Sequence, residues 1–161
     1  GISAAVGMAL AGKIDKKDYR VYAILGDGEL DEGQVWEAAM SADKYQLDNL
    51  LAVVDYNKMQ IDGTTDDVMP LGDLAAKWTA FGWNVIEADG HDYAALAGAF
   101  DQARTVKGRP TVVLAHTIKG KGVSFMEGVY TWHGKAPNDE QYAQAKGELE
   151  AHLSQLEEEG K

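Results

Sequence analysis

Short, largely apolar runs alternate along this chain with longer segments that have helical periodicity. Four of these runs have the length of a buried strand: Val21–Leu25, Leu50–Val54, Trp83–Ala88 and Thr111–Ala115. Buried strands that alternate with helices predict an α/β fold, in which a parallel β-sheet is flanked by helices on both faces. Sheets of this kind bind ligands at the carboxyl ends of their strands.

The segments around these runs predict the helices and one long loop. Helices are expected at Ile2–Ala11, Val35–Tyr45, Leu71–Phe81, Tyr93–Val106 and Asp139–Leu156. The first is small and apolar throughout, as in a helix packed on both sides, and such a helix is not expected to open an independent domain. The segment Lys119–Asn138 has four glycines and no period, which indicates a loop.

Length and composition limit the class of protein. The 161 residues are expected to form one domain, 1–161, with a net charge of −11 that argues against nucleic-acid binding. The absence of cysteine excludes disulfides and zinc–thiolate sites. No apolar stretch approaches the roughly 20 residues of a membrane span. The chain begins with Gly1 and not with Met, so we expect it to be processed or cut. We also expect a cytoplasmic protein.

The ends of the first two predicted strands have side chains that can bind a metal. Asp27 lies in Gly26-Asp27-Gly28 after the first strand, and Asn57 follows the second strand 30 residues later, about the length of one strand–helix–strand unit. A carboxylate and an amide oxygen side by side suit Mg²⁺, with the main-chain carbonyl of Met59 as the expected third ligand. The two glycines would let phosphate approach and can adopt positive φ. The helix that follows would direct free N–H groups at the anion.

Other interpretations of Gly26-Asp27-Gly28 remain open at this point. Taken alone, such a tripeptide is more often a turn than a binding site. A calcium loop that starts at Asp27 would need glycine at its sixth position and glutamate at its twelfth, where this chain has Glu32 and Ala38. Neither a G-x-x-x-x-G-K-[ST] phosphate loop nor a G-x-G-x-x-G fingerprint is present.

The wider context of the two strand ends resembles a known family. The segments Gly26–Gly33 and Asp55–Gly63 resemble the thiamine-diphosphate signature, and the continuation Asp-x-Asn-x-x-x-Ile-Asp-Gly is similar to transketolase in particular. Other stretches that resemble transketolase are Gly1–Ala9, Thr117–Gly122 and Trp132–Pro137. The resemblance covers nearly the whole chain, with its motifs in the expected order.

The resemblance implies a cofactor and its ligands. The cofactor is thiamine diphosphate with Mg²⁺, or with Ca²⁺ or Mn²⁺ in its place. Asp27, Asn57 and the main-chain carbonyl of Met59 correspond to the metal ligands, and Gly26 and Gly28 would line the diphosphate.

Four further residues match family positions near the cofactor. Ile61 and Ile118 would contact its rings, although both can equally be core isoleucines. His133 would reach the diphosphate and the substrate, as a proton donor or hydrogen-bond partner. Glu32 matches a glutamate at the subunit interface where two active sites communicate, the alternative being an acid favoured by a helix dipole.

The histidines outside the family motif receive other expectations. His91 precedes a predicted helix and is interpreted as part of a turn and cap. His116 follows a strand and can line the pocket, whereas His152 is expected on the surface. Trp36, Trp78 and Trp83 are expected in the core or at an interface.

By this resemblance the chain acts in ketol transfer. A two-carbon unit would pass from a ketose phosphate to an aldose phosphate, as in the pentose phosphate pathway. We expect the chain, whether a truncated amino-terminal subunit or an excised piece, to act only with a pyrimidine-binding partner subunit or domain, as a dimer or heterotetramer. The alternatives are a 1-deoxyxylulose-phosphate synthase, a ketoacid dehydrogenase component and a non-catalytic α/β module.

Overall fold

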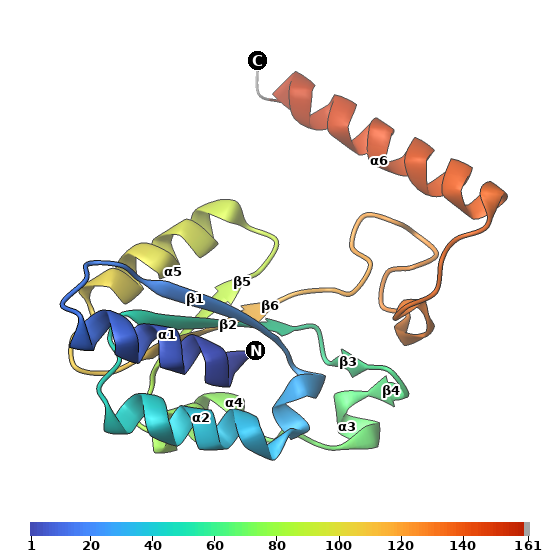
Figure 1. The fold of residues 1–161 in the computed structure, drawn as a ribbon. Helices are drawn as coiled ribbons and strands as arrows, with labels where there is room; N and C mark the ends of the chain where they lie inside the picture. Colours follow the sequence, from blue (N-terminus) through green and yellow to red (C-terminus); the bar gives the residue numbers. More distant parts are fainter. Residues whose placement is uncertain (160–161) are drawn as a thin grey trace.

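A four-stranded parallel sheet forms the centre of the computed structural model, which describes residues 1–159 (Figure 1). The strands lie in the order β1-β2-β6-β5 and have these bounds: β1 Val21–Gly26, β2 Leu50–Tyr56, β5 Asn84–Asp89 and β6 Thr111–His116. All four predicted strands are confirmed, and their ends differ from the predicted ends by at most about two residues. Since every pair in the sheet is parallel, the four carboxyl ends meet at one edge.

Helices cover both faces of this sheet, which confirms the predicted α/β fold. Helices α1 (Ile2–Ile14), α2 (Gly33–Lys44) and α4 (Leu74–Ala80) lie on one face, and α5 (Tyr93–Thr105) lies on the other (Figure 1). The shorter elements are two 3-10 turns, η1 (Gly28–Asp31) and η2 (Tyr130–Trp132), helix α3 (Thr65–Val68), and a hairpin of β3 (Met59–Gln60) and β4 (Gly63–Thr64). Helix α6 (Asp139–Glu159) ends the described chain.

The two hydrophobic layers follow from the alternation of side chains along each strand. In β2, Leu50, Ala52 and Val54 pack toward α1, α2 and α4, whereas Leu51 and Val53 pack toward α5. Strand β6 alternates in the same register, because it pairs with β2 residue by residue. Both faces of the central strands are therefore buried, as is typical of parallel sheets.

Three tryptophans form the centre of the larger layer. Trp78 packs against Trp36 and Trp83, with ring centroids 5.1 and 4.8 Å away. Trp78 and Trp83 are fully buried, and Trp83 Nε1 donates to the carbonyl of Ala39 at 3.1 Å. These residues are thus core aromatics, one of the two expected locations.

Two details of the predicted helices were wrong. Helix α1 buries only the face with Ile2, Val6 and Ala9, while Met8 on its other side is exposed, so it is not packed on both sides within this chain. Helix α4 starts at Leu74, not Leu71, because Gly72 has a φ of +63° and Asp73 caps the helix.

The last part of the described chain stands away from the sheet (Figure 1). The predicted loop is confirmed, apart from the short turn η2, and it leads to α6. Glu148 on α6 accepts hydrogen bonds from Ser124 N and Ser124 Oγ at 2.7 and 2.6 Å, which tie the helix to the loop. The apolar stripe of α6 is exposed along its length: Tyr142, Leu149, Leu153 and Leu156. Over residues 1–159, no helix combines the length and the apolar character needed to cross a membrane.

Candidate functional site

The expected meeting of Asp27 and Asn57 at one edge of the sheet is confirmed. Asp27 is the first residue after β1, and Asn57 is the first after β2. The two strands are parallel neighbours, in which Gly26 pairs with Asp55, and Asp27 N donates to the Asp55 carbonyl at 3.3 Å. The parallel register therefore places a carboxylate and an amide side chain next to each other.

Most of the predicted site residues line one cavity of about 480 Å³ at this edge. They are Gly26, Asp27, Gly28, Glu32, Asn57, Met59, Ile61 and His133. The cavity is also lined by four residues that were not predicted: Glu29, Asp55, Gln60 and Lys119. Its volume lies in the range of small-molecule and cofactor pockets.

Asp27 is a buried carboxylate with fixed geometry. Only 1% of its surface is exposed. Its Oδ1 accepts from Gly28 N at 2.8 Å, and its Oδ2 accepts from Lys58 N at 2.5 Å. Burial raises the pKa of this carboxyl above its ordinary value, the Lys58 and Gly28 N–H groups oppose that shift, and the charge of Asp55 adds to it. A bound cation would compensate both the burial and the repulsion.

The turn after β2 presents the second group of oxygens. Asn57 Oδ1 accepts from Met59 N at 2.9 Å, which orients the amide. Lys58 between them has a φ of +61°, an unusual conformation for a residue other than glycine. In this conformation its N–H group reaches Asp27. The turn after β2 is therefore linked to the end of β1 through the hydrogen bond from Lys58 N to the Asp27 carboxylate.

The two glycines serve the site differently from the prediction. Neither Gly26 nor Gly28 adopts a positive φ, so that expectation was wrong. A Cβ on Gly28 would lie 2.8 Å from Cβ of Gln60, so this glycine is required by the close approach of the hairpin. A Cβ on Gly26 would meet nothing within 4 Å, which leaves its backbone open to the cavity.

The expected supply of free N–H groups is also smaller than predicted. The helix that follows Asp27 is a four-residue 3-10 turn, and its first N–H, on Gly28, is already taken by Asp27. Gly26 N donates to Glu29 Oε2 at 3.3 Å. An anion that approached Gly26 would therefore compete with the Glu29 side chain.

The oxygen atoms at this edge of the sheet suit a hard cation. Asp27 offers a carboxylate, Asn57 an amide oxygen and Met59 a main-chain carbonyl, all of which are oxygen ligands of the kind that Mg²⁺, Ca²⁺ and Mn²⁺ prefer. Within residues 1–159, no three His, Cys, Asp or Glu side chains form a group that could hold a metal alone. The site suits an ion that takes its remaining ligands from water and phosphate.

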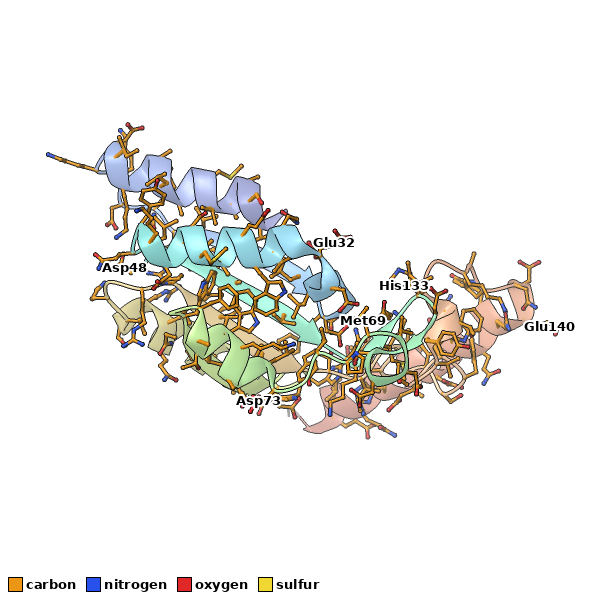
Figure 2. All side chains as sticks on the ribbon, turned by 90° about the horizontal axis from the view of Figure 1, so that it is seen from below. Glu32, Asp48, Met69, Asp73, His133 and Glu140 are labelled. Atoms are coloured by element: carbon orange, nitrogen blue, oxygen red, sulfur yellow. The ribbon has the colours of Figure 1, made fainter. Side chains whose placement is uncertain are left out.

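The loop side of the cavity carries the other predicted residues. Figure 2 shows Glu32 at the start of α2 and His133 in the loop before α6, at the same end of the sheet. Glu32 occupies the N-cap position of α2 but its side chain makes no capping hydrogen bond. Both side chains are exposed, and half-buried Lys119 lines the cavity with them.

The two isoleucines lie in different places. Ile61 lines the cavity and is 64% exposed, whereas Ile118 is 43% exposed and lines a neighbouring hollow with His91 and His116. Neither belongs to the core, so the alternative of ordinary core isoleucines is wrong for both.

The remaining histidines lie outside the cavity. His116 lines the neighbouring hollow, where its Nε2 lies 2.7 Å from Glu87 Oε2. The predicted turn at His91 is confirmed by its main-chain N–H, which donates to Asp89 Oδ1 at 2.8 Å. His152 is exposed on α6, as predicted.

The sequence contained a signal for two of the four cavity residues that were not predicted. Asp55 lies within β2, two residues before Asn57, and alternate residues of a strand share a face. Lys119 lies within Thr117–Gly122, one of the segments that resemble transketolase. Glu29 and Gln60 had no such signal, because a 3-10 turn and a two-residue strand bring them to the cavity.

Comparison with known proteins identifies the family of this chain. Residues 1–155 match the family described as transketolase, thiamine diphosphate binding domain. An apulose-4-phosphate transketolase subunit of Phocaeicola vulgatus is 45% identical over 159 residues, which are 99% of this chain and 57% of that protein. The 6-deoxy-6-sulfo-D-fructose transketolase subunit SqwG of a Clostridium species is 51% identical over 150 residues, or 93% of this chain and 54% of that protein.

The fold agrees with this relationship. The crystal structure of transketolase from Campylobacter jejuni superposes with a TM-score of 0.86 at 30% identity, and the match covers 91% of this chain and 24% of that one. The chain thus spans a little over half the length of the curated subunits it matches, and about a quarter of that transketolase. The chain belongs to the transketolase family and corresponds to its thiamine diphosphate binding domain.

Proposed function

We propose that the chain binds thiamine diphosphate with Mg²⁺ in the cavity at the carboxyl edge of the sheet. We further propose that it serves the transfer of a two-carbon ketol unit from a ketose phosphate to an aldose phosphate. The single observation that supports the binding site best is the pair of oxygen side chains, Asp27 and Asn57, at the ends of adjacent parallel strands.

The strand ends would hold the metal. Asp27, Asn57 and the Met59 carbonyl would provide oxygen ligands, while phosphate and water would complete the set. Asp27 is already oriented by two N–H groups, and Asn57 by one, so little side-chain freedom remains to be lost on binding. Ca²⁺ or Mn²⁺ can use the same ligands.

The diphosphate would lie against Gly26 and Gly28. The open space at Gly26 supports close approach, and Lys119 brings a positive charge to the lining of the cavity. Glu29, Glu32 and Asp55 also line this cavity, so an anion needs the metal and Lys119 to offset three acids. Bound thiamine diphosphate supplies the carbon nucleophile of ketol transfer.

His133 is the proposed proton donor of the site. His133 lines the cavity and is exposed, so a substrate can reach it. An imidazole can donate a proton or a hydrogen bond to a phosphate or a sugar hydroxyl near neutral pH. Glu32 is proposed to act at a subunit interface, which its exposure supports.

A pyrimidine-binding partner subunit or domain is part of the proposal. Ile61 at the mouth of the cavity, Ile24 on β1 and the leucines of α6 are all exposed, which supports burial against another protein surface. Two of the relatives are named as subunits of transketolases. We therefore expect no ketol transfer by the chain alone.

Calorimetry with Mg²⁺ and thiamine diphosphate tests the metal assignment. The unmodified chain should give saturable binding, and Asp27→Ala should abolish it, because the metal loses its only buried carboxylate. Asp66→Ala is the matched control, since Asp66 is exposed on α3 and does not line the cavity. Unchanged binding by the Asp27 variant, with the control also unchanged, contradicts the site.

Reconstitution with a competent partner subunit tests the reaction. Xylulose 5-phosphate with ribose 5-phosphate is the first substrate pair to measure. Apulose 4-phosphate and 6-deoxy-6-sulfofructose, the ketoses in the relatives' names, are further donors to test. Ketol transfer with any of them supports the proposal, and its absence with all of them favours the synthase, the dehydrogenase component or the non-catalytic module.

A further inference from the structure

Four hydrogen bonds attach the His116 carbonyl, Thr117 and the Ile118 amide to neighbouring segments. Thr117 N donates to the Tyr56 carbonyl at 3.3 Å, and the Thr117 hydroxyl donates to Asp55. Gly90 N donates to the His116 carbonyl at 2.8 Å. The fourth bond is different, because its acceptor is an imidazole: Ile118 N donates to Nε2 of His91 at 2.8 Å.

The His91 side chain is set in a rigid turn between β5 and α5. Its own main-chain N–H is fixed by Asp89, and the next residue, Asp92, caps α5 by accepting from two N–H groups. A Cβ on Gly90 would lie 2.4 Å from Cγ2 of Thr117, so the turn packs tightly against the segment after β6. The His91 imidazole thus extends toward Ile118 from a turn that these contacts hold in place.

This bond defines the state of the imidazole. A ring nitrogen that accepts a hydrogen bond must have a free lone pair, so Nε2 carries no proton. His91 is then neutral, with its proton on Nδ1. Protonation of Nε2 would place one donor against another and break the contact with Ile118.

The bond also lies next to the cavity. Lys119 follows Ile118 directly and lines the cavity, while Gly120 after it has a φ of +72° and turns the chain away. Because Thr117 is attached to Asp55 and Tyr56, the bond to His91 is the last of these four attachments before Lys119. On its other side the Lys119 main chain is held by Gly128 N, which donates to the Lys119 carbonyl at 2.8 Å.

We propose that His91 is a positioning residue: its neutral imidazole holds Ile118 so that Lys119 faces the anionic ligand of the cavity. The role of Lys119 in this inference rests on the proposed function, whereas the attachment of Ile118 does not. Since His91 itself lines only the neighbouring hollow, it acts through the main chain and touches no cofactor.

Several charged groups lie around the imidazole. Asp89 and Asp92 lie on its own turn. Across the hollow lie His116, which pairs with Glu87, and Lys121.

Amide hydrogen exchange of Ile118 tests the attachment without any cofactor. The amide should be protected in the unmodified chain at pH 8 and should exchange at least about tenfold faster in His91→Ala. His91→Gln places an amide oxygen near the position of Nε2 and should restore protection, whereas His91→Asn is too short to reach Ile118 and should not. His116→Ala is the control from the same hollow and should leave the exchange of Ile118 unchanged. Equal exchange in all four variants and the unmodified chain overturns the inference.

Affinity for thiamine diphosphate in the presence of Mg²⁺ tests the consequence for Lys119. We expect His91→Ala and His91→Asn to bind about tenfold more weakly at pH 8, and His91→Gln to bind as the unmodified chain does. Faster exchange of Ile118 together with an unchanged affinity overturns the role of Lys119. Failure of the unmodified chain to bind at all would instead contradict the proposed function.

Discussion

The two sides of the cavity are built in different ways. On the strand side, Asp27 and Asn57 leave adjacent parallel strands, and their oxygens are fixed by main-chain N–H groups. On the loop side, His133 follows the short turn η2 in a segment without regular pairing. Asp27 is buried and His133 is exposed. The comparison indicates that the strand side, where we propose that the metal binds, is formed by the fold itself.

The loop side depends on a few local contacts. Trp132 packs on Phe125 with centroids 5.3 Å apart, and its Nε1 donates to the Phe125 carbonyl at 3.0 Å. Lys135 lies over the Trp132 ring at 4.7 Å. These few contacts stabilise the loop but leave much of it exposed. We therefore expect the surface of a partner protein to cover the loop side of the cavity.

The largest expected difference between the two sides is in stability. Trp78→Ala should lower the free energy of unfolding by about 3–5 kcal/mol, because Trp78 is fully buried beneath the strand side between two other tryptophans. The same change at Trp132 should cost less than about 2 kcal/mol, since that ring packs only within the loop. Urea denaturation measures both values, and equal losses would contradict the contrast.

Substitution of two glycines tests the structure of the strand side. Gly28→Ala should destabilise the chain by about 1–3 kcal/mol, because the new methyl group would overlap Cβ of Gln60. Gly26→Ala should change stability little, since a Cβ there has free space, yet it should weaken binding of Mg²⁺–thiamine diphosphate. Thermal unfolding and calorimetry of the pair separate these effects. A stable Gly28 variant and an unfolded Gly26 variant would contradict the packing role of Gly28 and the binding role of Gly26.

Backbone conformation provides a smaller test of the same comparison. Lys58 on the strand side has a φ of +61°, so Lys58→Gly should raise stability by less than about 1 kcal/mol by relieving the left-handed conformation. Gly134 on the loop side has a φ of +86°, and Gly134→Ala should lower stability by about 1 kcal/mol. Denaturant midpoints check both signs, and a loss of stability in the Lys58 variant contradicts the first.

The smallest effect is expected at the far end of β2, away from both sides of the cavity. Burial raises the pKa of the Asp48 carboxyl, but the Gly108 N–H and the Lys13 ammonium lower it more, so the result lies below the ordinary value. Because a lowered pKa stabilises the folded state above the unfolded-state value of about 3.9, Asp48→Asn should cost less than about 1 kcal/mol at pH 7. The difference should disappear as the pH falls through the lowered pKa. A difference that persists at pH 2 would point to lost packing instead.

The strand side could be predicted from the sequence, because it depends on rules of strand register. Apolar runs located β1 and β2, and parallel pairing then required Asp27 and Asn57 to meet. The hairpin of β3 and β4 could not be predicted, since two-residue strands have no period. The left-handed Lys58 gave no signal either, as its conformation is imposed by the turn that it closes.

The loop side was predictable only through family resemblance, which placed both His133 and Ile118 at the cofactor. His133 does line the cavity, whereas Ile118 lines the neighbouring hollow. Ile118 lies beside the cavity because its main chain is attached to His91, and that contact joins two turns that are far apart in the sequence. No local pattern contains such a contact. The predicted start of a helix at Leu71 failed for a local reason, the left-handed Gly72 followed by the Asp73 cap.

The position of a bound metal is the most direct test of the strand-side site. Crystals of the chain grown with thiamine diphosphate and Mn²⁺ allow the metal to be located by its anomalous scattering. We expect one peak in bonding contact with the carboxylate of Asp27, the amide oxygen of Asn57 and the carbonyl of Met59. A peak bound to other residues, with these three oxygens free of metal, would contradict the account.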